Sequence, residues 1–99
     1  MRDSITKRFN VKDRGLPDIN SRNKRIVTPE IITLIYVPDD PGPVNGIYPV
    51  RVEVEGPCRR ARPSQFPTPR RTTEWFYRNW PEFWPDWLIT FAANHRPNQ

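Results

Sequence analysis

The clearest pattern in the chain is an alternation of apolar and charged side chains over residues 47–55. The apolar positions are Tyr48, Val50, Val52 and Val54, and Arg51, Glu53 and Glu55 fall between them. A period of two is typical of a β-strand with one buried face. Pro49 lacks an N–H and therefore confines this predicted strand to the edge of a sheet, or leaves its amide side unpaired there.

A second strand is predicted over residues 30–37, which read Glu-Ile-Ile-Thr-Leu-Ile-Tyr-Val and are rich in β-branched side chains. Thr28 and Pro29 offer the alternative of a helix start, with threonine as N-cap and proline at the first helical position. We favour the strand because Pro38 ends the run early. Residues 38–46 are dense in turn formers and end in Asn45-Gly46, so the two strands should form a β-hairpin.

Aromatic side chains dominate residues 72–99. Five of them are spaced by 4, 3, 4 and 4 residues, which would align them on one face of a helix: Phe76, Trp80, Phe83, Trp87 and Phe91. Pro81 and Pro85 interrupt that helix. The pattern therefore predicts a helical turn over residues 73–80, a corner, and a second helix over residues 85–93 that ends at Asn94.

The first 27 residues have few apolar side chains, chiefly Ile5, Phe9 and Leu16, and include the polar run from Asn20 to Arg25. This composition predicts a basic arm that is flexible in isolation. Ser4 could instead cap a short helix, although a helix this short is marginal in water.

Length and composition set the fold class. A chain of 99 residues fits one small domain. Its 13 prolines and mean hydropathy of −0.81 indicate a thin core. We expect a small α+β fold with four segments: a basic arm (1–27), the hairpin (28–57), an extended Arg/Pro-rich linker (58–71) and the aromatic helical segment (72–99). The formal charges of these segments are +5, −4, +5 and −1.

The Arg/Pro-rich segment is the first candidate site. Its arginines are predicted to contact an anionic partner, either a nucleic acid or an acidic groove on a protein: Arg59, Arg60, Arg62, Arg70 and Arg71. The guanidinium group forms bidentate contacts with phosphate and carboxylate, and the prolines favour an extended backbone that displays it. The alternative is a solvated linker with no binding role.

The tryptophans are the second candidate site. We expect them to divide between the core of the fold and anchors for a protein partner: Trp75, Trp80, Trp84 and Trp87. Stacking platforms for single-stranded nucleic acid would use the same side chains, but the acidic residues in this block disfavour that interpretation.

The scarce residue types argue against catalysis. Cys58 is the only cysteine and His95 the only histidine, so no intrachain disulfide can form and no metal-ligand cluster can be read. The glycines form no phosphate-binding loop, and no apolar run reaches the length of a membrane span. We therefore expect no cofactor, no metal and no small-molecule substrate. The N-terminal residues lack the apolar stretch of a secretory signal, which favours a reducing intracellular compartment over secretion.

These observations predict a non-enzymatic interaction protein. The preferred hypothesis is a small accessory subunit or docking factor that becomes ordered on a larger protein or ribonucleoprotein assembly. Two alternatives remain: a small basic protein that binds nucleic acid such as RNA through its arginines, and a compact viral protein that docks on a host factor.

Overall fold

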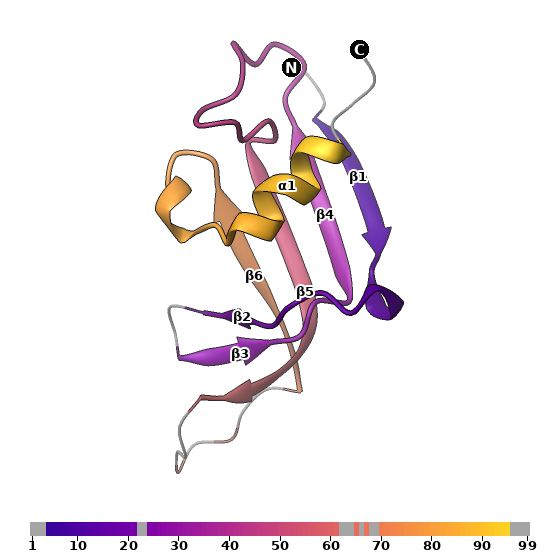
Figure 1. Ribbon diagram of the computed structural model, residues 1–99, viewed down its shortest axis with the longest axis vertical. Helices are drawn as coiled ribbons and strands as arrows, with labels where there is room; N and C mark the ends of the chain where they lie inside the picture. Colours follow the sequence, from indigo (N-terminus) through magenta and orange to yellow (C-terminus); the bar gives the residue numbers. More distant parts are fainter. Residues whose placement is uncertain (1–3, 22–23, 62–64, 66, 68–69, 96–99) are drawn as a thin grey trace. The chain divides into compact units, whose positions relative to one another are not determined.

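The computed structural model describes residues 4–21, 24–61, 65, 67 and 70–95. Within these residues, six strands form an antiparallel sheet in the order β1-β4-β5-β3-β2, with β6 also paired to β5 (Figure 1). The strands are β1 (Ile5–Asn10), β2 (Ile19–Asn20), β3 (Arg25–Val27), β4 (Ile31–Tyr36), β5 (Arg51–Arg60) and β6 (Arg71–Tyr77). The described helices are α1 (Asp86–Asn94) and the 3-10 turns η1 (Lys12–Arg14) and η2 (Pro81–Phe83). The predicted α+β class is confirmed.

The strands predicted around the hairpin are present, but the second differs in extent. β4 matches the β-branched run, whereas β5 begins at Arg51 rather than Ile47 and continues to Arg60. β5 is bonded to three other strands, β4, β3 and β6, so it is not an edge strand. Pro49 lies before the strand, where its missing N–H leaves no gap in the hydrogen-bond ladder.

The predicted chain reversal closes on the Asn-Gly pair. Asn45 and Gly46 both have positive φ, 53° and 82°, as the two-residue turn of a hairpin requires. Val44 and Ile47 exchange backbone hydrogen bonds of 3.2 and 2.9 Å across it.

The C-terminal segment differs in its first half. Of the residues predicted as a helical turn, 73–77 belong to strand β6, because β6 pairs with β5. Just beyond the two strands, the Arg78 N–H donates to the Val50 carbonyl at 3.1 Å. Successive side chains of β6 therefore point to opposite faces of the strand, with Glu74 and Phe76 buried and Trp75 and Tyr77 exposed. The second helix is confirmed as α1, with Pro85 at its N-cap and Asn94 as its last residue.

Residues expected to be an arm and a linker contribute to the sheet. β1, β2 and β3 lie in the predicted arm, and the last four residues of β5 lie in and beside the predicted linker. The physical reason is non-local pairing, in which Ile26 of β3 lies opposite Arg59 of β5. Gly56 permits a close approach of the two backbones there, since a Cβ at this position would lie 1.8 Å from the Thr28 carbonyl oxygen.

The chain divides into two compact units. Unit 1 comprises residues 1–7, 33–52 and 75–99, and unit 2 comprises residues 8–32 and 53–74. Buried apolar side chains of unit 1 include Leu34, Ile47, Val52, Phe76, Trp84, Leu88, Phe91 and Ala92. Those of unit 2 include Val11, Ile19, Val27, Ile32 and Val54. No helix in the described part of the chain is both long and apolar enough to cross a bilayer.

Candidate functional site

Unit 1 carries a group of large aromatic side chains that face solvent. We call them the aromatic surface: Trp75, Tyr77, Trp80 and Phe83, with exposed fractions of 47%, 39%, 49% and 45%. The first two stand on one face of β6, two residues apart, and the other two follow in the turn and in η2.

The rings of the aromatic surface pack edge to face. The ring centroid of Trp80 lies 5.9 Å from that of Tyr77 and 6.4 Å from that of Phe83, with interplanar angles of 76° and 80°. Backbone bonds hold this arrangement, because the Trp80 N–H donates to the Tyr77 carbonyl at 3.0 Å and the Phe83 N–H donates to the Trp80 carbonyl at 3.2 Å. These contacts fix the positions of Tyr77, Trp80 and Phe83 relative to one another.

The other two predicted tryptophans lie elsewhere. Trp84 is 5% exposed, its ring packs against Phe76 with centroids 6.1 Å apart, and its Nε1–H donates to the Tyr77 carbonyl at 3.0 Å. Trp87 is half-buried on α1. The structure thus places Trp84 in the core of unit 1 and leaves Trp75 and Trp80 on its surface.

The backbone N–H and carbonyl groups of β6 point alternately to the two edges of the strand. Arg78, the residue after β6, donates its N–H to the carbonyl of Val50, the residue before β5. In an antiparallel ladder the backbone groups of the even-numbered residues of β6 in unit 1 therefore face β5. The N–H and carbonyl groups of Trp75 and the N–H of Tyr77 consequently point to the other edge. Among the described strands, none pairs with that edge.

An arginine beside the aromatic surface clamps the turn of unit 1. Arg78 binds both carboxylate oxygens of Asp40, through Nη1 to Oδ2 and through Nη2 to Oδ1 at 2.7 Å, and its Nη1 also donates to the Gly42 carbonyl at 2.9 Å. The two side chains are only 12% and 15% exposed. The hydrogen bond from Arg78 lowers the pKa of the Asp40 carboxyl below its ordinary value.

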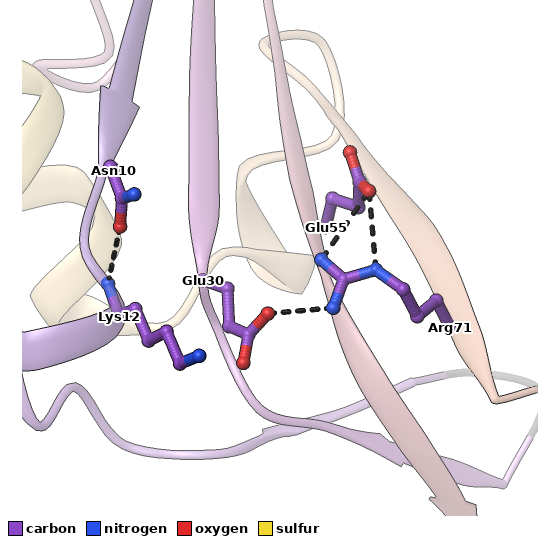
Figure 2. A network of polar contacts seen from close by, with 5 residues as sticks. All are labelled: Asn10, Lys12, Glu30, Glu55 and Arg71. Carbon is purple, nitrogen blue, oxygen red and sulfur yellow. Dashed lines mark hydrogen bonds and ion pairs between the residues drawn. The ribbon is translucent and has the colours of Figure 1, made fainter.

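Unit 2 carries a second arginine network, which lies in solvent. Figure 2 shows Arg71 between two carboxylates: its Nη1 donates to Glu30 at 2.6 Å, and its Nε and Nη2 each donate to Glu55 at 3.4 Å. The same view shows the Lys12 N–H donating to the Asn10 side chain at 3.1 Å. The hydrogen bond to Glu30 raises the pKa of Arg71 above its ordinary value.

Among the described residues, the predicted anion-binding arginines differ in their partners. Arg71 is held by the two glutamates, and Arg59 donates through Nη2 to Asp18 at 3.2 Å. Arg70 is exposed, and Arg62 lies outside the described residues. The Asp18 carboxylate also accepts from the Thr28 hydroxyl at 3.0 Å, which ties this pair to the chain segment after β3.

Arg60 has a neighbour that the sequence did not identify. The β3–β5 register places Arg25 directly opposite Arg60, and Lys24 precedes Arg25 in the turn between β2 and β3. In the sequence these two cations belong to the polar run of the predicted arm, which carries no local sign of a pairing with residues 58–60. Only the register of the sheet brings them together.

The scarce nucleophilic and metal-ligating residues form no recognisable centre. Within the described residues, no three histidine, cysteine or carboxylate side chains gather closely enough to hold a metal ion. The His95 ring stacks on Phe91 with centroids 4.2 Å apart, and its Nδ1 lies 2.8 Å from the Phe91 carbonyl. The Tyr36 hydroxyl donates to the His95 carbonyl at 3.4 Å, and burial raises the pKa of Tyr36 to about 12.

Comparisons with known proteins give no relative for this chain. No protein family, no curated protein and no solved structure matches it.

Proposed function

We propose that this protein is a non-enzymatic interaction protein that docks on a larger protein partner through the aromatic surface of unit 1. The observation that supports this proposal best is the exposure of four neighbouring aromatic side chains, each 39% to 49% accessible. Tryptophan and tyrosine are the side chains most enriched among the residues that dominate binding energy at protein interfaces.

Solvent exposure of this surface is unfavourable in the isolated protein. Burial of apolar area contributes about 25 cal/mol per Å², so a partner that covers these rings gains a large favourable term. Contiguous apolar patches on monomeric proteins are frequently binding sites for this reason. The edge-to-face packing of Tyr77, Trp80 and Phe83 also limits the side-chain entropy that binding would cost.

The open edge of β6 favours a particular mode of docking. Trp75 and Tyr77 point their backbone N–H groups toward the unpaired side of the strand while their rings stand on the exposed face. An extended segment of the partner would add as a strand along this edge and place its own apolar side chains against the rings. Backbone hydrogen bonds would supply affinity, and the rings would supply specificity.

The balanced charge of unit 1 indicates that electrostatic attraction does not select the partner. Unit 1 contains five basic and five acidic residues and is formally neutral. Binding through the aromatic surface should therefore be nearly independent of salt concentration. The alternative of nucleic-acid binding through the predicted arginines receives less support, because Arg59 and Arg71 are paired with carboxylates of the same chain.

Site-specific photo-crosslinking tests the proposal. A benzoylphenylalanine at position 83 should crosslink to a protein partner in 0.5 M salt, whereas the same group at the exposed position 90 of α1 should not. The double substitution Trp75→Ala and Trp80→Ala should lower the yield from position 83 by about tenfold or more.

Two results would overturn the proposal. One is an equal crosslinking yield from positions 83 and 90, since random collision would then account for both. The other is a yield at position 83 that survives removal of both tryptophans.

A further inference from the structure

A pair of arginines lies face to face in unit 2, on the ladder between β3 and β5. Arg25 is the direct cross-strand partner of Arg60. Backbone hydrogen bonds lie one and three residues away along the same ladder. The Ala61 N–H donates to the Lys24 carbonyl at 3.0 Å, and the Thr28 N–H donates to the Pro57 carbonyl at 3.0 Å. These bonds make Arg25 and Arg60 a non-hydrogen-bonded pair, in which the two Cα atoms approach to about 4.5 Å.

This arrangement is electrostatically unfavourable for the protein alone. Like charges directly opposite each other destabilise a sheet. The Nε atoms of Arg25 and Arg60 are both buried and lack a hydrogen-bond partner in the structure. Among the described residues, no carboxylate forms an ion pair with Lys24, Arg25 or Arg60. The nearby Asp18 is already engaged by Arg59 and Thr28.

A pocket opens beside Arg25. It has a volume of about 240 Å³ and is lined by Asn20, Ser21, Lys24, Arg25 and Ala61. That volume is about eight times the share of one water molecule in the liquid and lies below the range of typical cofactor pockets. Its size suits one small group rather than an extended ligand.

Backbone hydrogen bonds join three of the residues that line the pocket. Ser21 donates its N–H to the Arg25 carbonyl at 2.7 Å, and Lys24 donates its N–H to the Ser21 carbonyl at 3.0 Å. Lys24 has a φ of 60°, which is uncommon for a residue with a side chain. These bonds hold Lys24 and Arg25 beside the same pocket.

We propose that this pocket binds a phosphate group, with Lys24 and Arg25 as the cationic ligands that line it and Asn20 as an additional donor. Arg60 does not line the pocket and contributes positive charge from its place directly across the ladder from Arg25. A phosphate carries up to two negative charges, and its oxygens match the fork of a guanidinium group. Bound beside Arg25, it would offset the repulsion between Arg25 and Arg60. The source is either a free phosphate compound or the phosphorylated end of a nucleic acid, which share this chemistry.

This inference is independent of the docking proposal. The phosphate pocket belongs to unit 2, whereas the aromatic surface belongs to unit 1. Unit 2 contains eleven basic and six acidic residues and carries the whole net charge of +5, which agrees with an anionic ligand.

A titration of the full-length chain with inorganic phosphate, followed by ¹H–¹⁵N NMR, tests the inference. Sodium chloride at matched ionic strength serves as the reference. We expect saturable shifts of the amide signals of Ser21, Lys24, Arg25 and Ala61. Substitution of Arg25→Gln or Arg60→Gln should weaken phosphate binding about tenfold or more.

Matched variants distinguish the loss of phosphate binding from the loss of the folded structure. Arg8→Gln removes the same charge from an exposed position on β1, which pairs with none of β2, β3 and β5, and it should leave the affinity unchanged. Arg25→Gln and Arg60→Gln should melt at or above the wild-type temperature, because each removes a like-charge contact. Arg60→Lys, which keeps the charge without the fork, should retain part of the affinity.

Two oligonucleotides then distinguish the sources. If a 5′-phosphorylated single strand binds more tightly than its unphosphorylated form, the ligand is a nucleic-acid end. If inorganic phosphate saturates the pocket and the two strands bind alike, the ligand is a free phosphate compound. The inference is overturned if phosphate causes no saturable shifts beyond those of chloride, or if Arg8→Gln weakens binding as much as Arg25→Gln.

Discussion

The two units of the molecule differ in what they expose. Unit 1 is formally neutral and contains all four tryptophans, of which Trp75 and Trp80 face solvent. Unit 2 contains no tryptophan and carries the entire net charge of +5. This difference is the basis of the two proposals, protein docking for unit 1 and phosphate binding for unit 2.

Each unit also contains an arginine paired with carboxylates, and the two arginines differ in their exposure to solvent. In unit 1 the Arg78–Asp40 pair is largely buried and is further bonded to the Gly42 carbonyl. In unit 2 the Arg71 side chain is 45% exposed and contacts two glutamates. Burial removes the screening by water, so the first contact should contribute to stability and the second should contribute little.

The largest effect within unit 2 is expected from Gly56→Ala. The new methyl group would overlap the Thr28 carbonyl oxygen, so the β3–β5 backbones must move apart. We expect a loss of about 3 kcal/mol or more in the free energy of unfolding, measured by urea denaturation. Hydrogen exchange should show the loss of protection centred on the amides of β3.

Gly15→Ala is the control for this substitution. Gly15 has a φ of +64° and open space around its Cβ position, so the change should cost only about 1 kcal/mol of backbone strain. Equal losses from the two variants would show that the close approach at Gly56 is unimportant.

The next effect is expected from Arg78→Ala in unit 1, which leaves the Asp40 carboxylate without its bidentate partner. Breaking a fully buried pair costs about 3–5 kcal/mol, and the residual exposure here reduces the expected loss to about 2 kcal/mol. Urea denaturation at pH 7 measures it.

The pH dependence of that difference gives an independent check. Because Arg78 lowers the pKa of Asp40, the stabilisation should be complete above the unfolded carboxyl value of about 3.9 and should disappear as the pH falls through the lower folded value. The gap between the wild type and Arg78→Ala should therefore close only below about pH 4. A gap that closes between pH 5 and pH 7 would contradict this assignment.

The smallest effect is expected from Arg71→Ala. The ion pairs of Arg71 are exposed and screened, so the free energy of unfolding should change much less than in Arg78→Ala. Half-molar salt should remove most of whatever difference remains. A loss as large as that of Arg78→Ala would show that exposure does not distinguish the two networks.

Local sequence signals predicted β4, the Asn45-Gly46 turn and α1. Each depends on neighbouring residues: a β-branched run, a pair that tolerates positive φ, and a proline at a helix start. Strand β6 was missed because both of its faces carry aromatic side chains. Trp75 and Tyr77 conceal the alternation with buried Glu74 and Phe76, and the spacing of Phe76 and Trp80 imitates a helix.

The missed parts of the candidate sites depend on contacts between distant residues. β3 has only three residues, too few to show an alternating pattern, so neither its pairing with β5 nor the Arg25–Arg60 pair can be read from the segment itself. The division of the tryptophans likewise depends on η2, which directs Trp84 onto Phe76. Residue type indicated the candidate side chains, and the sheet register decides which of them meet.

Thermal unfolding of two tryptophan variants tests the central claim, that unit 1 uses Trp84 for folding and exposes Trp75 and Trp80 for binding. Trp84→Ala should lower the free energy of unfolding by about 3–5 kcal/mol, which corresponds to a fall of roughly 12 °C or more in the melting temperature. The double variant Trp75→Ala and Trp80→Ala should melt within a few degrees of the wild type. A double variant that melts as early as Trp84→Ala would place the exposed rings in the folding core and contradict the account.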